Sequence, residues 1–173
     1  MKLLLTSSGL DNKKVRRELL KLSKKKGLNQ KVLLIFGVLT KFERNYLNKT
    51  KKELKDAGFN RKNIIEVNIS KNISEKDFNK ECDIVYVCGG NTFYILDRLR
   101  KTGFDKLIKK LVKGNKLYFG VSAGSIIAGP SIKIAGWGSE ADSNEVKLKN
   151  LNGLNFKNIA LFPHYKPNLK KEV

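Results

Sequence analysis

Residues 117–125 read Leu117-Tyr118-Phe119-Gly120-Val121-Ser122-Ala123-Gly124-Ser125. The apolar run predicts a buried strand, the serine between two glycines predicts a tight turn, and the small residues that follow predict the start of a helix. A turn of this kind lifts the serine hydroxyl off the strand end and sets it beside the N-terminus of the helix. Ser122 is therefore a candidate nucleophile, although a glycine-rich turn of this pattern can also bind a phosphate or simply pack tightly.

Short apolar runs like this one recur along the chain and alternate with amphipathic, lysine-rich stretches. The predicted strands are Leu3–Thr6, Val32–Phe36, Ile64–Ile69, Ile84–Val87, Leu117–Val121 and Ile159–Phe162. Several are apolar at consecutive positions, which favours strands that are covered on both faces. We therefore expect one domain over residues 1–173 with an α/β fold, a three-layer α/β/α sandwich around a mostly parallel sheet.

Helical stripes fill the intervals between these strands. The clearest stripe ends at Gly114 and consists of Phe104, Leu107, Ile108, Leu111 and Val112. Rougher stripes are formed by Val15, Leu19 and Leu22, and by Phe42, Tyr46, Leu54 and Ala57. Ser74 with Asp77 predicts a helix start. The pattern breaks down over residues 129–153, where we expect loops and short strands at 130–134 and 146–151.

Charge and cysteine usage exclude several classes of protein. The chain has 36 Lys+Arg against 16 Asp+Glu, a net charge of +20. The lysines are spread over many predicted helix faces, whereas phosphate binding needs charges gathered on one face, so we favour a solvated basic surface over a nucleic-acid site. Two separated cysteines and one histidine argue against structural zinc, and we expect no metal or other cofactor. No apolar run reaches membrane length, so the sequence predicts a cytoplasmic protein without a membrane partner.

His164 is the only histidine in the chain, so any serine-histidine mechanism must use it. It follows a predicted strand, and catalytic residues of open α/β sheets lie at strand ends. A half-exposed loop histidine is the alternative. The pairing with Ser122 favours a general base that takes the hydroxyl proton.

A catalytic histidine needs a carboxylate to fix its tautomer. Three acids lie between Ser122 and His164, namely Glu140, Asp142 and Glu145. We favour Asp142, with Glu140 second. The alternative is that Asp142 and Glu140 are both acids on the surface of a loop, without a catalytic role.

A second glycine-rich turn follows the strand at 84–87. Gly89-Gly90-Asn91-Thr92 precedes a helical run, and two glycines at such a junction let backbone amides approach a ligand closely. Beside the serine turn, the amide of Gly90 is a candidate oxyanion donor together with that of Ala123. A plain helix cap by Asn91 or Thr92 is the alternative.

Taken together, these motifs resemble peptidase family S51, the peptidase E and cyanophycinase group. Val87–Phe93 is similar to the glycine-glycine-asparagine-threonine turn of the family, Gly120–Ser125 to its nucleophile elbow, and Phe162–Tyr165 to its histidine motif. The resemblance runs from the first strand to His164. It implies a fold related to class I glutamine amidotransferases, with serine in the place of their cysteine.

The resemblance further implies a serine peptidase with Ser122 as nucleophile and His164 as base. It gives Asp142 as the best match for the third member. From the two turns we expect Gly89, Gly90, Asn91 and Ala123 to be the oxyanion and substrate-binding residues. The implied substrates are small peptides, in particular dipeptides with an N-terminal aspartate. Relatives continue through another helix and strand, so the chain is expected to be short at its C-terminus, and a carboxylate from that portion is another possible third member.

Three other functions fit parts of the sequence. An α/β-hydrolase esterase has the same order of serine, acid and histidine, but only 42 positions (164 less 122) separate Ser122 from His164 here. A non-catalytic member of the fold would bind a ligand or partner through the same pocket. A basic nucleic-acid binder would show steep salt dependence. The sequence leaves the oligomeric state open.

Overall fold

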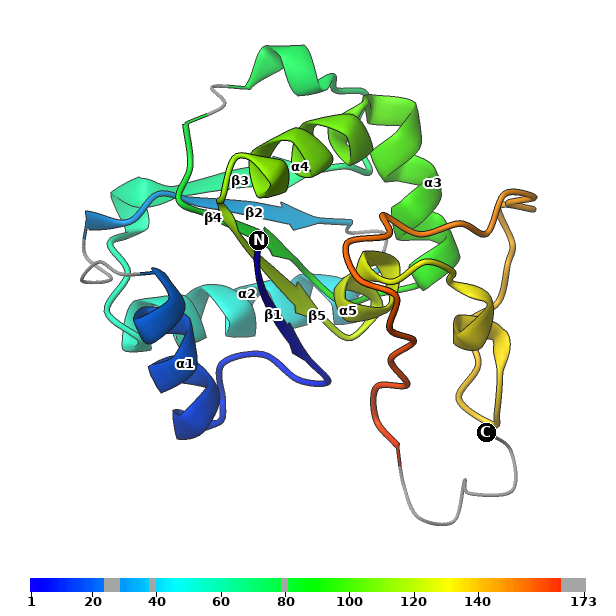
Figure 1. Cartoon of the computed structure of the whole chain (residues 1–173), viewed down its shortest axis with the longest axis horizontal. Helices are drawn as coiled ribbons and strands as arrows, with labels where there is room; N and C mark the ends of the chain where they lie inside the picture. The colour runs from blue at the N-terminus through cyan, green and yellow to red at the C-terminus, as the bar shows by residue number, and fades with distance from the viewer. Residues whose placement is uncertain (24–28, 38–39, 79–80, 166–173) are drawn as a thin grey trace.

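The computed structural model describes residues 1–23, 29–37, 40–78 and 81–165 of the chain. Its sheet has five parallel strands in the order β1-β5-β4-β2-β3 (Figure 1). The strands are β1 (Lys2–Thr6), β2 (Val32–Phe36), β3 (Ile64–Asn68), β4 (Ile84–Val87) and β5 (Leu117–Val121). Because all neighbours run parallel, the carboxyl ends of all five strands meet at one edge of the sheet.

Helices cover both faces of this sheet, and the predicted three-layer α/β/α arrangement is confirmed. One face carries α1 (Lys13–Ser23) and α2 (Lys41–Asp56), and the other carries α3 (Thr92–Thr102), α4 (Phe104–Lys113) and α5 (Ala123–Ala128). Three short 3-10 helices complete the described elements, η2 (Arg61–Asn63), η3 (Glu75–Asp77) and η4 (Lys133–Gly136).

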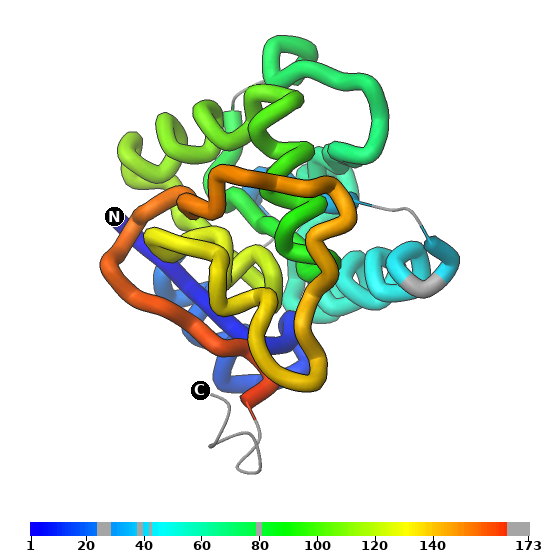
Figure 2. Tube along the Cα trace, turned by 90° about the vertical axis from the view of Figure 1, so that its right-hand side faces the viewer, coloured from blue at the N-terminus to red at the C-terminus, as the bar shows by residue number. Residues whose placement is uncertain are grey.

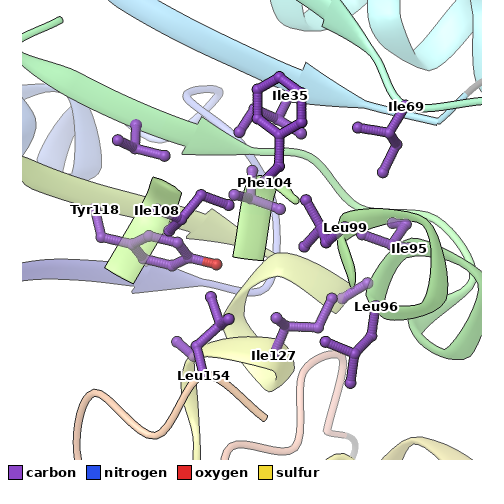
Figure 3. Close-up of a cluster of buried hydrophobic side chains, with 14 of the residues drawn as sticks. Ile35, Ile69, Ile95, Leu96, Leu99, Phe104, Ile108, Tyr118, Ile127 and Leu154 are labelled. Atoms are coloured by element: carbon purple, nitrogen blue, oxygen red, sulfur yellow. The ribbon is translucent and has the colours of Figure 1, made fainter. Parts of the chain in front are cut away.

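Strand β2 shows why the strands are apolar at consecutive positions. Leu33 and Ile35 pack into the cluster of buried side chains under α3, α4 and α5, part of which Figure 3 shows. Val32, Leu34 and Phe36 pack into the cluster under α1 and α2. Side chains alternate between the faces of a strand, so a strand with two covered faces must be apolar throughout.

The predicted helix start at Ser74 is confirmed as a capping box. The Asp77 carboxylate accepts a hydrogen bond from the Ser74 amide at 2.8 Å, and the Ser74 hydroxyl caps η3. A second capping box, which joins Thr40 and Glu43, begins α2. It fixes the first turn of α2 at the carboxyl edge of the sheet.

Several predictions for the C-terminal part were wrong. Residues 159–162 form no strand. The Ile159 carbonyl group instead packs against Gly129 at the end of α5, and Ile159 is 48% exposed. Residues 130–134 hold one isolated antiparallel bridge, from Ser131 to Asn152, before η4 begins, and residues 146–151 are irregular. A four-residue apolar run does not by itself distinguish a strand from an extended loop. The sequence also predicts the start of a helix at Lys166–Lys171, and this stretch lies outside the described residues.

The irregular segment over residues 129–165 runs along the outside of the layer that holds α3 and α5 (Figure 2). The guanidinium group of Arg100, on α3, donates to the carbonyl oxygens of Asn150 and Asn152 at 2.5 Å each. The Asn91 side chain donates to the carbonyl oxygen of Ser143 at 2.8 Å. These contacts hold the irregular segment against α3. The segment contains Asp142 and leads on to His164.

Ser125 ties β1, β5 and α5 together at the carboxyl edge of the sheet. Its buried hydroxyl oxygen lies 2.8 Å from the Thr6 carbonyl oxygen and 2.7 Å from that of Gly120, and it accepts a hydrogen bond from the Thr6 amide at 2.9 Å. The Ser122 amide in turn donates to the Thr6 carbonyl. One buried hydroxyl therefore hydrogen-bonds to backbone groups of both β1 and β5.

We predict that Ser125→Ala destabilises the protein by about 2 kcal/mol, because it leaves the Thr6 amide without its hydroxyl partner and removes the hydrogen bond that the buried hydroxyl donates to a backbone carbonyl. Thermal unfolding should show a decrease in Tm of about 4–8 °C. Ser8→Ala, at an exposed serine, is the control and should change the stability by about 0.5 kcal/mol or less. Equal Tm values for the two variants would contradict this role of Ser125.

Candidate active site

Ser122 has a backbone conformation that residues other than glycine rarely adopt. Strand β5 ends at Val121 and α5 begins at Ala123, and the serine between them has φ 50° and ψ −113°. Non-glycine residues with positive φ store strain and concentrate at functional sites. The strand-turn-helix geometry expected of a nucleophile elbow is present here.

The two glycines around Ser122 allow α5 to approach the sheet. A Cβ atom on Gly120 would lie 2.6 Å from the Gly124 carbonyl oxygen, and one on Gly124 would overlap the Val87 carbonyl oxygen of β4. Any larger residue would force the helix and the strands apart. The glycines of the motif are thus required by the packing of α5 on β4 and β5, independently of any chemistry.

The structure brings Ser122 and His164 together. The Ser122 Oγ atom lies 3.0 Å from His164 Nε2, within hydrogen-bond reach, although 42 positions separate the two residues. His164 also has positive φ, at 60°. The rings of Phe162 and Tyr165, which lie close to it in the sequence, contact each other edge to face with centroids 6.5 Å apart.

The Gly89-Gly90 turn lies directly against the serine. A Cβ atom on Gly89 would lie 3.1 Å from Ser122 Cβ, and Gly90 has φ 138°, a conformation that favours glycine. Asn91 caps α3, because its Oδ1 atom accepts from the Tyr94 amide at 2.9 Å. Asn91 therefore has the capping role that the sequence left open for it.

Asp142 lies at the same end of α3. Its Oδ2 atom accepts a hydrogen bond from the Thr92 amide at 2.8 Å, and its own amide donates to the Ala135 carbonyl. Within the described residues, the carboxylate makes no hydrogen bond to the His164 ring. The orienting role of Asp142 stays a prediction, and its contact with Thr92 was not anticipated from the sequence.

Two cavities open on either side of the serine-histidine pair. The first, of about 260 Å³, is lined by Ser7, Ser8, Phe36, Gly37, Glu43, Tyr46, Leu47, Cys88, Gly89, Gly90, Ser122 and His164. It lies where β1, β2, β4 and β5 end, the position at which open α/β sheets bind ligands. The second, of about 120 Å³, includes Trp137, Glu140, Asp142 and Phe162 beside Gly90, Ser122 and His164.

Cys88 and Tyr46, which also line the first cavity, stay neutral. Burial raises the pKa of the Cys88 thiol far above its usual range, and that thiol is only 2% exposed. Burial likewise raises the pKa of the Tyr46 phenol. A protonated, buried thiol is a poor nucleophile, so Cys88 does not compete with the hydroxyl groups that line the cavity.

Sequence reasoning missed the contributions of β1 and α2 to this cavity. Ser7 and Ser8 follow β1 directly, and Glu43 and Tyr46 lie on the first turns of α2. The position of Ser7 and Ser8 in the sequence could have indicated this role, because polar residues that directly follow an apolar strand lie at the ligand-binding edge of the sheet. The one motif that includes Glu43 is its capping-box spacing from Thr40. That spacing indicates the start of a helix and does not indicate a ligand-binding residue.

Two further features are absent from the described residues. No group of three or more His, Cys, Asp or Glu side chains among them could hold a metal ion. In the same part of the chain, no helix is long and apolar enough to cross a membrane.

Comparison with known proteins places the same residues in a family context. A family model described as peptidase family S51 matches residues 3–173. An uncharacterized peptidase from Listeria monocytogenes serovar 1/2a is 40% identical over 91 residues, which make up 53% of this chain and 44% of the relative. Peptidase E from Nostoc sp. is 30% identical over 132 residues, 75% of this chain and 50% of the relative. The chain spans about half the length of these curated relatives.

Two solved structures share the fold. A crystal structure of a Listeria monocytogenes EGD-e protein, described as a candidate peptidase E, is 31% identical, with a TM-score of 0.80 over 99% of this chain and 83% of that chain. A peptidase from an acI-B1 Actinobacterium has a TM-score of 0.64 at 16% identity and covers 98% of this chain and 69% of its own. At that identity the second likeness concerns the fold alone.

We predict that Gly124→Ala disrupts the elbow, because the new methyl group would overlap the Val87 carbonyl oxygen. We expect a large loss of stability, about 3 kcal/mol or more, measured by urea unfolding. Gly136→Ala is the matched control, since its methyl group would meet only Phe93 Cζ at 3.7 Å and its φ is not positive. If Gly124→Ala were as stable as Gly136→Ala, the close approach of α5 would not constrain the site.

Proposed function

The chain belongs to peptidase family S51, as its motifs predicted, and from that membership we propose that it is a serine peptidase that hydrolyses small peptides. The observation that carries the proposal is the 3.0 Å contact between Ser122 Oγ and His164 Nε2 at a strained strand-helix turn. A histidine at that distance can take the hydroxyl proton and make the oxygen nucleophilic. The family match also speaks against the α/β-hydrolase esterase that the sequence left open.

In the proposed mechanism, Ser122 Oγ attacks the scissile carbonyl carbon while His164 Nε2 takes its proton. The carbonyl oxygen becomes an oxyanion, for which the amides of Gly90 and Ala123 are the proposed donors. His164 then gives the proton to the nitrogen of the leaving amine, and the C–N bond breaks to leave an acyl-enzyme. Water, deprotonated by His164, attacks the ester, and collapse of the second oxyanion releases the acid and restores Ser122.

As substrates we propose dipeptides with an N-terminal aspartate, as the resemblance to the family implies. Several similar relatives carry the name peptidase E. Among the lining residues that the structure describes, neither cavity has a lysine or arginine. Selectivity for the aspartate side chain would therefore need a cation from outside these lining residues.

Ser122→Ala tests the nucleophile. We expect wild-type protein to be labelled by a fluorophosphonate probe and to hydrolyse Asp-Leu, and we expect the variant to lose both, with kcat/KM lower by about a thousandfold or more. His164→Ala should lower kcat similarly while the protein stays folded. Labelling that persists in Ser122→Ala would contradict the proposal. Absence of both labelling and hydrolysis in the wild type would favour the non-catalytic binding protein instead.

Asp142→Asn separates two roles for that carboxylate. We expect a change in kcat of only a few fold, because asparagine caps a helix as well as aspartate and the Thr92 contact would persist. If Asp142 orients His164, the same variant should instead lower kcat by about a hundredfold or more without loss of stability. Steady-state kinetics combined with thermal unfolding distinguishes the two results.

A further inference from the structure

We propose that Glu43 binds the free α-ammonium group of the substrate, so that the first cavity holds the N-terminal residue of a short peptide. This inference rests on the proposed function and deepens it by naming the group that the cavity recognises. Glu43 lines the cavity beside Ser122, Gly90 and His164.

Glu43 is the one carboxylate among the described residues that line the first cavity. The other lining groups there are hydroxyls, apolar side chains, glycines, His164, and the neutral groups of Tyr46 and Cys88. The cavity is therefore a mainly uncharged space with a single negative group. A cationic ligand group would find one matching charge in it, and an anionic one would find none among these residues.

The carboxylate of Glu43 is held in place by the start of α2. Its Oε2 atom accepts from the Thr40 amide at 2.8 Å and from the Thr40 hydroxyl at 3.1 Å. Its Oε1 atom lies on the side of Gly90, where a Cβ atom built on that glycine would lie 3.9 Å away. The capping box thus fixes a carboxylate oxygen close to the proposed oxyanion donor.

The covalent geometry of a peptide connects this oxygen to the reaction centre. In an N-terminal residue, the ammonium nitrogen and the carbonyl carbon are bonded to the same Cα atom and lie about 2.5 Å apart. An ammonium group hydrogen-bonded to Glu43 therefore brings the carbonyl of its own residue beside Gly90 and Ser122. An internal residue has a neutral amide at this position and gains no charge pairing from Glu43.

The second cavity then takes the leaving half of the substrate. It shares Gly90, Ser122 and His164 with the first and is bounded by Phe162 and by Trp137, whose side chain is 48% exposed. An arrangement with the ammonium group on one side of the serine and the leaving group on the other suits removal of one N-terminal residue.

Binding to the Ser122→Ala protein tests the inference without turnover. We would titrate Ala-Leu and Asp-Leu, each with a free and with an acetylated N-terminus, by calorimetry. We expect the free form of at least one dipeptide to bind about tenfold or more tightly than its acetylated form, as a charged hydrogen bond lost on acetylation implies.

Glu43→Gln in the same background should abolish this preference, because glutamine keeps the capping contacts but carries no charge. Thr40→Ala is the matched control: it removes the capping hydroxyl and leaves the carboxylate, so it should lower Tm and retain the preference. Circular dichroism would show that all variants are folded.

The failures of the inference and of the proposed function are distinguishable. Equal or undetectable binding of free and acetylated forms, or a preference that persists in Glu43→Gln, would overturn the role of Glu43, even if a fluorophosphonate labels Ser122 in the wild type. A preference that depends on Glu43, in a protein that is neither labelled nor catalytic, would support the ammonium site and contradict the peptidase.

Discussion

The close approach of α5 to the sheet is the constraint on which the rest of the site depends. Gly120 and Gly124 leave room for helix and strand backbones to touch, and Ser125 satisfies the backbone groups at the end of β1. With both sides of the junction fixed, Ser122 has no relaxed conformation available and is held at positive φ. The strain at the serine is therefore maintained by packing and hydrogen bonds on its neighbours.

Around this junction, the parallel sheet supplies the remaining parts of the site at one edge. The ends of β1, β2 and β4 place Ser7, Gly37 and Gly89 around the same cavity, and the first turn of α2 adds Glu43. They come from three strand-helix units, since Gly37 and Glu43 belong to the unit of β2 and α2.

His164 is positioned beside Ser122 by an irregular segment and not by the sheet. The segment that carries it has no place in the sheet and is held by hydrogen bonds to α3, through Arg100 and Asn91, and by packing against the end of α5. Asp142 belongs to the same segment and contacts Thr92 at the start of α3. Helix α3 therefore joins the glycine turn at its N-terminus to the irregular segment. A displacement of one of these two segments would displace the other.

The sequence by itself determined the layers of the fold, the elbow and the serine-histidine pair. Consecutive apolar residues require two covered faces, and a single histidine leaves one candidate partner for the serine. The tertiary structure alone decided that residues 159–162 are irregular, that Asp142 contacts Thr92, and that Glu43 faces the cavity. These features depend on which segments meet across the sheet edge, whereas periodicity and turn chemistry report only on neighbours along the chain.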